Sequence, residues 1–396
     1  MVSEKMVCLG RKGSVIREIF EYGKKRKAEI GAENVFDFSL GNPSVPAPAE
    51  VTDTLVKLLQ ESEPTELHGY TSSAGDWNTR QKIADYLNQA YDAHASAAHI
   101  YMTCGAAASL TISLNAILEK GEEVIIFSPY FPEYTVFVEQ AGGIVVPVLC
   151  REEDFQPDSA AFAQSITKNT KAVIINSPNN PSGAVISSAM LTEICGIMKQ
   201  KQREFGHEIY LIADEPYREL AYDGVEVPYA TQFYDNTIVC YSFSKSLSLP
   251  GERIGYILVS DRMNQADTVF AAINGAGRAL GYVCAPSLFQ KLIPYCLGKT
   301  SDKSVYARNR EKLYQALVGN GFCVVKPEGA FYIFMKVPGG DANCFCEMAK
   351  KYELLLVPSD DFCFPGYVRI SYCVSEEQVE RSLPAFAKLA QECFGK

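Results

Sequence analysis

The middle of the chain contains short apolar runs separated by stretches long enough to form a helix. The runs are rich in β-branched residues and hydrophobic on both faces, which is typical of strands buried on both sides of a sheet. Strands that alternate with helices form a mostly parallel sheet flanked by helices, so the sequence predicts an α/β fold. The runs are EVIIF at 123–127, AVIINSP at 172–178, IYLIADEPY at 209–217, TIVCYSFSK at 237–245 and RIGYILVS at 253–260.

The pattern changes after about residue 290. A long helical stretch is followed by apolar runs that alternate less regularly and then by the helical segment EEQVERSLPAFAKLAQECF. The chain has 396 residues, which exceeds the size, about 250 to 300 residues, at which a single core stops growing. We therefore expect a large cofactor-binding domain at residues 46–290. A smaller α+β domain is expected from both chain ends, residues 1–45 and 291–396.

Charge and composition argue against several classes of protein. Lys and Arg number 37 against 47 Asp and Glu, and the net charge of −10 would repel a nucleic-acid backbone. No stretch reaches the roughly 18 apolar residues of a membrane span, and the first residues lack the apolar core of a signal peptide. The thirteen cysteines lack the paired spacing of a zinc site. We expect a cytoplasmic protein with reduced thiols, no metal, and neither nucleic acid nor membrane as partner.

Polar residues directly follow several predicted strands, at the sheet edge where ligands bind in parallel sheets. The run SFSKSLSLPGERIGY contains Ser242, Ser244, Lys245 and Arg253. An amine that can lose its proton, two hydroxyls and a guanidinium can bind a phosphorylated aldehyde covalently while holding its phosphate. The run therefore predicts a site for pyridoxal phosphate.

The chain resembles the fold-type I pyridoxal-phosphate enzymes of the class I/II aminotransferase family. The resemblance extends from Gly41 to Arg369, and the motifs LGNPS, CGAAASL, NSPNNPSG, IADEPY, SFSK and GYVRISY occur in the family's order. It implies that Lys245 forms the internal aldimine. Once a substrate amine displaces it, Lys245 would carry a proton between the substrate Cα and the cofactor. Desolvation and a nearby cation would lower the pKa of Lys245 for this role.

The resemblance also implies a set of phosphate ligands. Small residues at the start of a helix would let backbone N–H groups approach the dianion, and the helix dipole would add to the attraction. Tyr70, in HGYTSSAGDW, matches a tyrosine that reaches the phosphate from the partner subunit in family members, which implies a homodimer. The other implied ligands are Ser242, Ser244, Arg253 and the backbone cup of Gly105, Ala106 and Ala107.

Further matching residues would contact the cofactor ring. Asp214 would keep the pyridine nitrogen protonated, so that the ring accepts electrons from the substrate Cα. Tyr217 and Asn180 would donate hydrogen bonds to the ring hydroxyl. Phe131 matches the aromatic residue that stacks on the ring, and Tyr130 takes that place if the register slips by one residue.

The substrate-binding residues implied by the resemblance are Arg369, Gly41 and Asn180. Arg369 would bind the α-carboxylate through two parallel hydrogen bonds, and Gly41 would let the backbone approach the same group. Side-chain preference is open, because aspartate-type relatives often carry a lysine where this chain has Ala107. Arg278 of the partner subunit is a candidate to bind a distal carboxylate in its place.

The expected reaction is a ping-pong transamination, in which an L-amino acid leaves its nitrogen on pyridoxal 5′-phosphate and a 2-oxo acid then collects it. Two alternatives stay open. One is a carbon-sulfur β-lyase, since these reactions begin from the same aldimine. The other is a non-catalytic sensing domain of a transcription regulator, although only about forty residues precede Gly41 and the chain is acidic.

Overall fold

A seven-stranded sheet forms the centre of the computed structural model, which describes residues 2–11, 13 and 15–395. Strand β8 runs antiparallel to its neighbours β2 and β7, and the other adjacent pairs are parallel. The α/β class with a mostly parallel sheet is thus confirmed. In spatial order the strands are β2 (Ile100–Thr103), β8 (Gly255–Val259), β7 (Thr237–Ser242), β6 (Tyr210–Asp214), β5 (Thr170–Asn176), β3 (Glu123–Ser128) and β4 (Ile144–Leu149).

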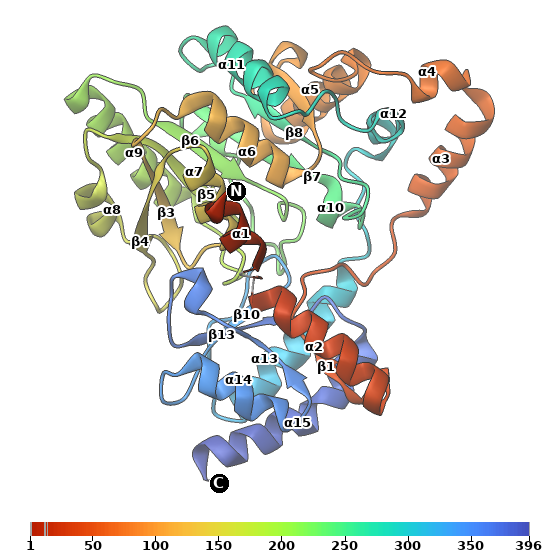
Figure 1. The fold of residues 1–396 in the computed structure, drawn as a ribbon, viewed down its shortest axis with the longest axis vertical. Coiled ribbons are helices and arrows are strands. Elements are labelled where there is room, and N and C mark those ends of the chain that lie inside the picture. The colour runs from red at the N-terminus through yellow and green to blue at the C-terminus, as the bar shows by residue number, and fades with distance from the viewer. Residues whose placement is uncertain (1, 12, 14, 396) are drawn as a thin grey trace.

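Helices cover both faces of this sheet (Figure 1). Because successive side chains of a strand point to opposite faces, each buried strand contributes to two cores. In β5, Val173 and Ile175 pack with α5, α8 and α9, whereas Ala172 and Ile174 pack with α6, α7 and α11. The helices are α5 (Trp77–Tyr91), α6 (Ala106–Ile117), α7 (Glu133–Gln140), α8 (Ser159–Ser165), α9 (Ser188–Phe205) and α11 (Ala266–Ala279).

A second, smaller sheet lies below the first in Figure 1. It is antiparallel, with the order β12-β13-β10-β9, and packs against helices from the C-terminal part of the chain. Its core is distinct from the two cores of the large sheet, and Tyr217, Leu220 and Tyr222, from the segment after β6, also belong to it. The elements are β9 (Cys323–Val324), β10 (Tyr332–Lys336), β12 (Val357–Pro358), β13 (Tyr367–Ser371), α13 (Ser304–Gly319), α14 (Ala342–Lys350) and α15 (Glu376–Phe394).

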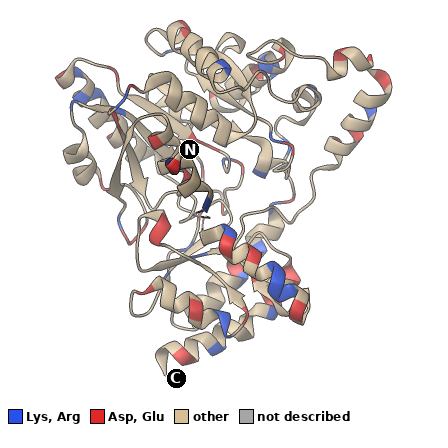
Figure 2. Ribbon diagram, in the orientation of Figure 1, with Lys and Arg blue, Asp and Glu red and all other residues tan. Residues whose placement is uncertain are grey.

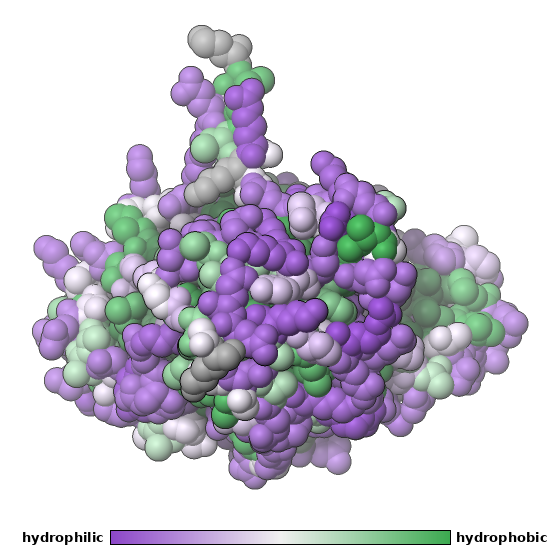
Figure 3. Space-filling view, turned by 90° about the horizontal axis from the view of Figure 1, so that it is seen from below, coloured by the Kyte–Doolittle hydropathy of each residue, from purple (hydrophilic) through white to green (hydrophobic). Residues whose placement is uncertain are grey.

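The N-terminal segment joins this smaller unit. Strand β1 (Phe36–Asp37) pairs with β11 (Leu354–Leu355), and α2 (Val15–Ile30) packs Ile19 against Leu355 and Phe362. Figure 1 shows α2, in red, among the blue C-terminal elements. Helix α1 (Glu4–Arg11) has no buried residue and stands out from the body (Figure 3). Residues 1, 12, 14 and 396 of the predicted small domain lie outside the described residues.

Helix α12 (Ser287–Cys296) spans the predicted domain boundary at residue 290. It packs against α3 (Ala49–Glu61) and α4 (Pro64–His68), and buries Leu292 and Ile293 in a core of the large sheet. We therefore propose that the large domain begins near residue 46, as the sequence predicts, and extends through α12.

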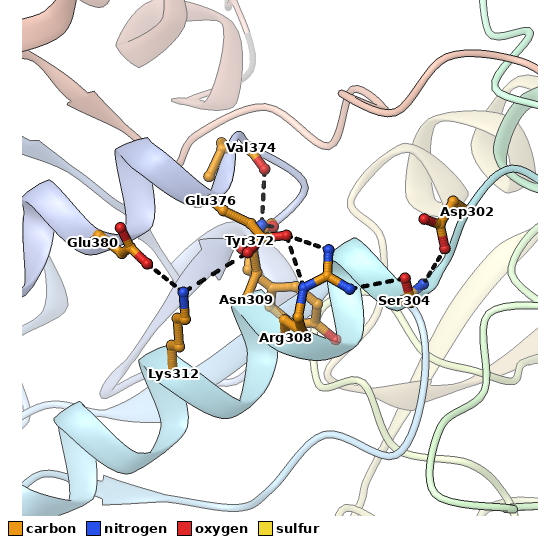
Figure 4. A network of polar contacts seen from close by, with 9 residues as sticks. All are labelled: Asp302, Ser304, Arg308, Asn309, Lys312, Tyr372, Val374, Glu376 and Glu380. Atoms are coloured by element: carbon orange, nitrogen blue, oxygen red, sulfur yellow. Dashed lines mark hydrogen bonds and ion pairs between the residues drawn. The ribbon is translucent and has the colours of Figure 1, made fainter.

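A polar network joins α13 to the segment that leads into α15 (Figure 4). The fully buried Asn309 donates hydrogen bonds to the carbonyl oxygens of Val374, at 2.8 Å, and Tyr372, at 3.1 Å. Arg308 and Lys312, on the same helix, form ion pairs with Glu376. Exposed ion pairs contribute little stability, so we assign the main anchoring role to Asn309.

Charged residues lie mainly on the outer helices, and the large sheet is nearly free of them (Figure 2). Among the described residues, no helix combines the length and apolar character that a membrane span requires. The cysteines are all free thiols.

Candidate active site

A cavity of about 820 Å³ opens at the carboxyl ends of the central strands, beside the small sheet. Strands β5, β6 and β7 end at Asn176, Asp214 and Ser242, and all three residues line it. Most of the residues predicted from sequence meet here. They are Gly41, Ala106, Ala107, Phe131, Asn180, Asp214, Tyr217, Ser242, Ser244, Lys245, Arg253 and Arg369.

Lys245 lies on the short helix α10 (Phe243–Ser246), directly after β7. Its amine donates a 2.7 Å hydrogen bond to the carbonyl oxygen of Gly41. Burial lowers the pKa of Lys245 to about 8, and the charges of Arg253 and Arg369 act in the same direction, while Cys373 opposes them. The neutral fraction of this amine at neutral pH is therefore larger than that of an ordinary lysine, which favours its use as a nucleophile.

The Arg253 guanidinium lies against the turn between β2 and α6. It donates hydrogen bonds to the carbonyl oxygens of Cys104 and Pro250, and its Nη1 is 3.4 Å from Ser244 Oγ. Gly105 has a φ of 83°, and a Cβ there would lie 2.7 Å from Arg253 Nη2. Glycine adopts this positive φ without strain, and its missing side chain leaves room for the guanidinium.

Two serines and a helix N-terminus complete this end of the cavity. Ser242 Oγ lies 2.8 Å from Ser244 Oγ and accepts a hydrogen bond from the Ser244 backbone. Helix α6 begins at Ala106, and its N-cap residue Gly105 supplies no side-chain cap to the first N–H groups. Hydroxyls, a guanidinium and uncapped N–H groups together form a site suited to a phosphate dianion.

Asp214 is buried at the end of β6. The Tyr134 hydroxyl donates a 2.5 Å hydrogen bond to Asp214 Oδ2, and Asn176 Nδ2 lies 3.4 Å from the same oxygen. Oδ1 has no hydrogen-bond partner among the described residues. Burial raises the pKa of Asp214 to about 7, although the bond from Tyr134 opposes the rise. A cationic ring nitrogen beside Oδ1 would remove the cost of ionising this carboxyl.

Tyr217 and Asn180 lie on the side of the cavity nearest the small sheet. The Tyr217 hydroxyl is 2.9 Å from the Tyr332 hydroxyl, and burial holds the pKa of Tyr217 well above its ordinary value. Asn180 Oδ1 accepts a 3.1 Å hydrogen bond from Arg369 Nη1, and its backbone N–H donates to Asn176 Oδ1. Asn180 therefore contacts the predicted carboxylate-binding arginine directly.

Arg369 extends into the cavity from β13 and is only 2% exposed. Nη2 donates a 2.6 Å hydrogen bond to the Ser39 carbonyl oxygen, whereas Nε has no hydrogen-bond partner among the described residues. Burial lowers the pKa of Arg369 from its usual value. The two hydrogen bonds of this guanidinium go to neutral oxygens, of Asn180 and Ser39, so its charge is left for a substrate carboxylate.

Gly41 lines the cavity, and the contact that requires a glycine there is with a protein side chain. A Cβ at Gly41 would lie 2.0 Å from the Tyr332 hydroxyl oxygen. Close approach of the Gly41 backbone to a substrate carboxylate stays a prediction. Phe131 also lines the cavity, whereas Tyr130 is buried elsewhere and bonds to Thr135.

Some predicted residues do not line this cavity. Gly105 lies just behind it, against Arg253. Tyr70 is 90% exposed on the loop after α4, and Arg278 is exposed on α11. The cross-subunit roles expected for Tyr70 and Arg278 stay predictions.

Sequence reasoning missed Tyr134, Asn176 and Tyr332. Tyr134 lies on the first turn of α7, whereas Phe131 precedes that helix, and their rings meet edge to face at 5.8 Å. Asn176 ends a predicted strand, which is a signal that could have found it. Tyr332 carries no such signal, because it lies within an apolar run.

The residues present fit pyridoxal 5′-phosphate. The lone Asp214 Oδ1 is an acceptor for a protonated ring nitrogen, and the amine of Lys245 is partly neutral. Arg253, with the serines and the start of α6, provides donors for the phosphate. This set combines covalent attachment, phosphate binding and ring protonation in one cavity.

Comparison with known proteins agrees with this geometry. The sequence model of the family "Aminotransferase class I and II" matches residues 33–386. The chain belongs to this family. Family members use pyridoxal 5′-phosphate as their cofactor, and the protein is a transaminase-type enzyme.

Several aminotransferases are similar over nearly their whole length. An aminotransferase structure from Eubacterium rectale is 52% identical, with a TM-score of 0.98, and the match covers 100% of this chain and 99% of that one. Aspartate aminotransferase of Thermotoga maritima is 31% identical over 93% of this chain and 95% of its own. Aspartate aminotransferase of Thermus thermophilus, solved with maleate, is 26% identical, with a TM-score of 0.87 and coverage of 98% and 100%.

Proposed function

We propose that this aminotransferase moves the amino group of an L-amino acid to a 2-oxo acid by a ping-pong mechanism, with Lys245 as the residue attached covalently to the cofactor. The observation that carries the proposal is the meeting of Lys245, Asp214 and Arg369 in one cavity. Each group can still bind a ligand. Lys245 has a lowered pKa, Asp214 has one oxygen without a hydrogen-bond partner among the described residues, and the hydrogen bonds of Arg369 go to neutral oxygens.

When bound, the cofactor supplies an aldehyde that reacts with amines and a ring that withdraws electrons. Asp214 holds a proton on the ring nitrogen through Oδ1. Tyr217 donates a hydrogen bond to the ring hydroxyl, and Phe131 packs on the ring face. Arg253, with Ser242 and Ser244, neutralises the phosphate charge.

The substrate is oriented by Arg369. Two parallel hydrogen bonds to the α-carboxylate fix the rotation of the amino acid, so that the Cα–H bond faces Lys245. Once the substrate amine has displaced it from the cofactor, the Lys245 amine would remove that proton as a general base and pass it to the carbon that carried the aldehyde. Its lowered pKa favours the neutral amine that this role needs. In the second half-reaction, with the 2-oxo acid as substrate, Lys245 would carry the proton in the opposite direction.

We further propose that the enzyme is a homodimer in which Tyr70 of the partner subunit contacts the phosphate. Tyr70, Val283 and Tyr295 are exposed apolar side chains on the neighbouring 68–71 loop, 281–286 loop and α12. Ser287 and Gln290 hydrogen-bond to Leu67 and Thr71, so these segments form one surface. A second copy that covers this surface would bring Tyr70 to the other active site.

The test is reduction of the cofactor-loaded protein with borohydride, followed by peptide mass spectrometry. The proposal expects the pyridoxyl mass on the peptide that contains Lys245, and none in the Lys245→Ala variant. Amine transfer is then measured with twenty amino acids against 2-oxoglutarate, pyruvate and oxaloacetate. Labelling at another lysine, or release of pyruvate and sulfide from cysteine without an oxo acid, would overturn the assignment.

A further inference from the structure

Tyr332 contacts two residues of the site, Tyr217 and Arg369. It is the first residue of β10, pairs with Ser371 of β13, and is 2% exposed. Its side chain lines the cavity between Tyr217 and Arg369. One side chain thus contacts a residue proposed to bind the cofactor ring and a residue proposed to bind the substrate.

The Tyr332 hydroxyl is a hydrogen-bond partner of the Tyr217 hydroxyl. It lies 2.9 Å from the Tyr217 hydroxyl, and burial raises the pKa of Tyr332 to about 12, so both phenols keep their protons. Each hydroxyl has a single proton to donate. If Tyr217 donates its proton to the cofactor's ring hydroxyl, the bond between the two tyrosines must be donated by Tyr332.

The Tyr332 ring has a second contact. The Arg369 guanidinium carbon lies 4.7 Å from its centroid and 5.2 Å from that of Phe362. Two aromatic faces thus hold the guanidinium, where a carboxylate would otherwise be expected to do so. This leaves the charge of Arg369 available to a ligand while its position stays fixed.

The same hydroxyl also packs on the backbone that orients Lys245. A Cβ at Gly41 would come within 2.0 Å of it, so residue 41 rests directly on Tyr332. The Gly41 carbonyl oxygen in turn accepts the hydrogen bond from Lys245. Tyr332 therefore contacts Tyr217 and Arg369 directly, and it is linked to Lys245 through Gly41.

We propose that Tyr332 is a positioning residue with two separable parts, and this rests on the proposed transaminase function. Its hydroxyl turns the Tyr217 proton toward the cofactor's ring hydroxyl. Its ring holds Arg369 in place for the substrate carboxylate. Neither part makes or breaks a bond in the reaction.

The variants Tyr332→Phe and Tyr332→Leu separate the two parts. Tyr332→Phe removes only the hydroxyl, which weakens hydrogen-bond donation by Tyr217 to the ring oxygen. The ring oxygen is then more negative and stabilises the proton on the neighbouring Lys245 nitrogen. The absorbance of the bound cofactor changes when that proton is lost, so the pH midpoint of this change, measured without substrate, rises by about 0.5 to 1 unit. The KM for the amino donor stays within about 2-fold, because the ring beside Arg369 is kept.

Tyr332→Leu removes the ring as well. We expect the same rise in the midpoint and, in addition, about 10-fold weaker binding of succinate, as a carboxylate probe, to the cofactor-loaded protein, measured by calorimetry. Tyr234→Phe is the matched control, since Tyr234 is equally buried and hydrogen-bonded to Ile209 but does not line the cavity. Tyr234→Phe should change neither the pH midpoint nor the affinity for succinate.

Two results would overturn the inference. An unmoved midpoint in Tyr332→Phe removes the hydroxyl's role, and equal succinate affinity in Tyr332→Phe and Tyr332→Leu removes the ring's role. Failure of the proposed function looks different, because the wild-type protein would then show no cofactor absorbance band or no amine transfer. Circular dichroism of each variant establishes that it is folded.

Discussion

The Tyr134 hydroxyl donates a 2.5 Å hydrogen bond to one oxygen of Asp214 and leaves the other oxygen without a partner among the described residues. The two oxygens of one buried carboxylate thus have different surroundings. The anchored oxygen fixes the orientation of the group. The lone oxygen is the one that a protonated ring nitrogen can use, so the asymmetry itself points at the cofactor.

Replacing Tyr134 by Phe should weaken cofactor binding. The hydrogen bond from Tyr134 lowers the pKa of Asp214, so its loss favours the neutral acid and weakens the ion pair with the ring nitrogen. A hydrogen bond to a charged group contributes about 1.5 to 3 kcal/mol, so the dissociation constant of the cofactor should rise by about 10-fold or more. Absorbance titration of the apoenzyme measures it. Tyr130→Phe, which loses a buried hydroxyl outside the cavity, should bind normally.

The stability of the apoenzyme should fall as pH rises from about 4 to 7 because of Asp214. The folded-state pKa is raised to about 7, while the unfolded chain ionises near 3.9. Between these values the folded state holds a proton that the unfolded state has lost, so ionisation favours unfolding by up to about 4 kcal/mol. Urea unfolding at pH 4.5 and 7.5 should show a smaller fall for Asp214→Asn. Parallel pH dependences of the two proteins would contradict this.

Arg369→Lys should raise the KM for the amino donor by about 10- to 100-fold. Lysine keeps the charge but cannot form two parallel hydrogen bonds to a carboxylate. The cofactor should still bind, since Arg369 hydrogen-bonds to Asn180 and Ser39 and to no residue of the phosphate site. Steady-state kinetics at saturating oxo acid measure the effect. A KM equal to that of the wild type would remove Arg369 from substrate binding.

A distal carboxylate offers a test of substrate class. If Arg278 of the partner subunit binds it, Arg278→Ala lowers kcat/KM for glutamate by about 10-fold or more and leaves alanine unaffected. Arg17, on α2, lines the cavity of its own subunit. The variant Arg17→Gln is therefore measured on the same two substrates, for comparison with Arg278→Ala. Equal losses on glutamate and alanine in Arg278→Ala would end the idea that Arg278 is a distal clamp.

The large sheet was readable from the sequence because its central strands are buried on both faces. The run that became β5 is apolar at consecutive positions, since Ala172 and Val173 belong to different cores. Edge strands lack that signal. β2 has only four residues, and β4 contains Pro147 and exposes Ile144, so neither was predicted.

The site was readable where a residue follows a strand or belongs to a motif. Lys245, Asp214 and Asn180 meet in the cavity as predicted, although their chemical roles stay proposals. Tyr332 could not be found in this way, because its contacts with Tyr217 and Arg369 exist only once the two sheets pack together. Local sequence carries no record of such long-range contacts.

Helix α2 contacts the small unit with one face and lines the cavity with another. Ile19 and Gly23 pack on the small unit, while Ile16, Arg17, Phe20 and Glu21 form a wall of the cavity. A protein shortened to begin at Gly31 would keep the groups proposed to hold the cofactor, but it would lose the cavity wall that α2 provides beside the proposed substrate site. Such a protein should still turn yellow with vitamin B6, yet let water reach the reacting carbon and discriminate poorly among amino acids.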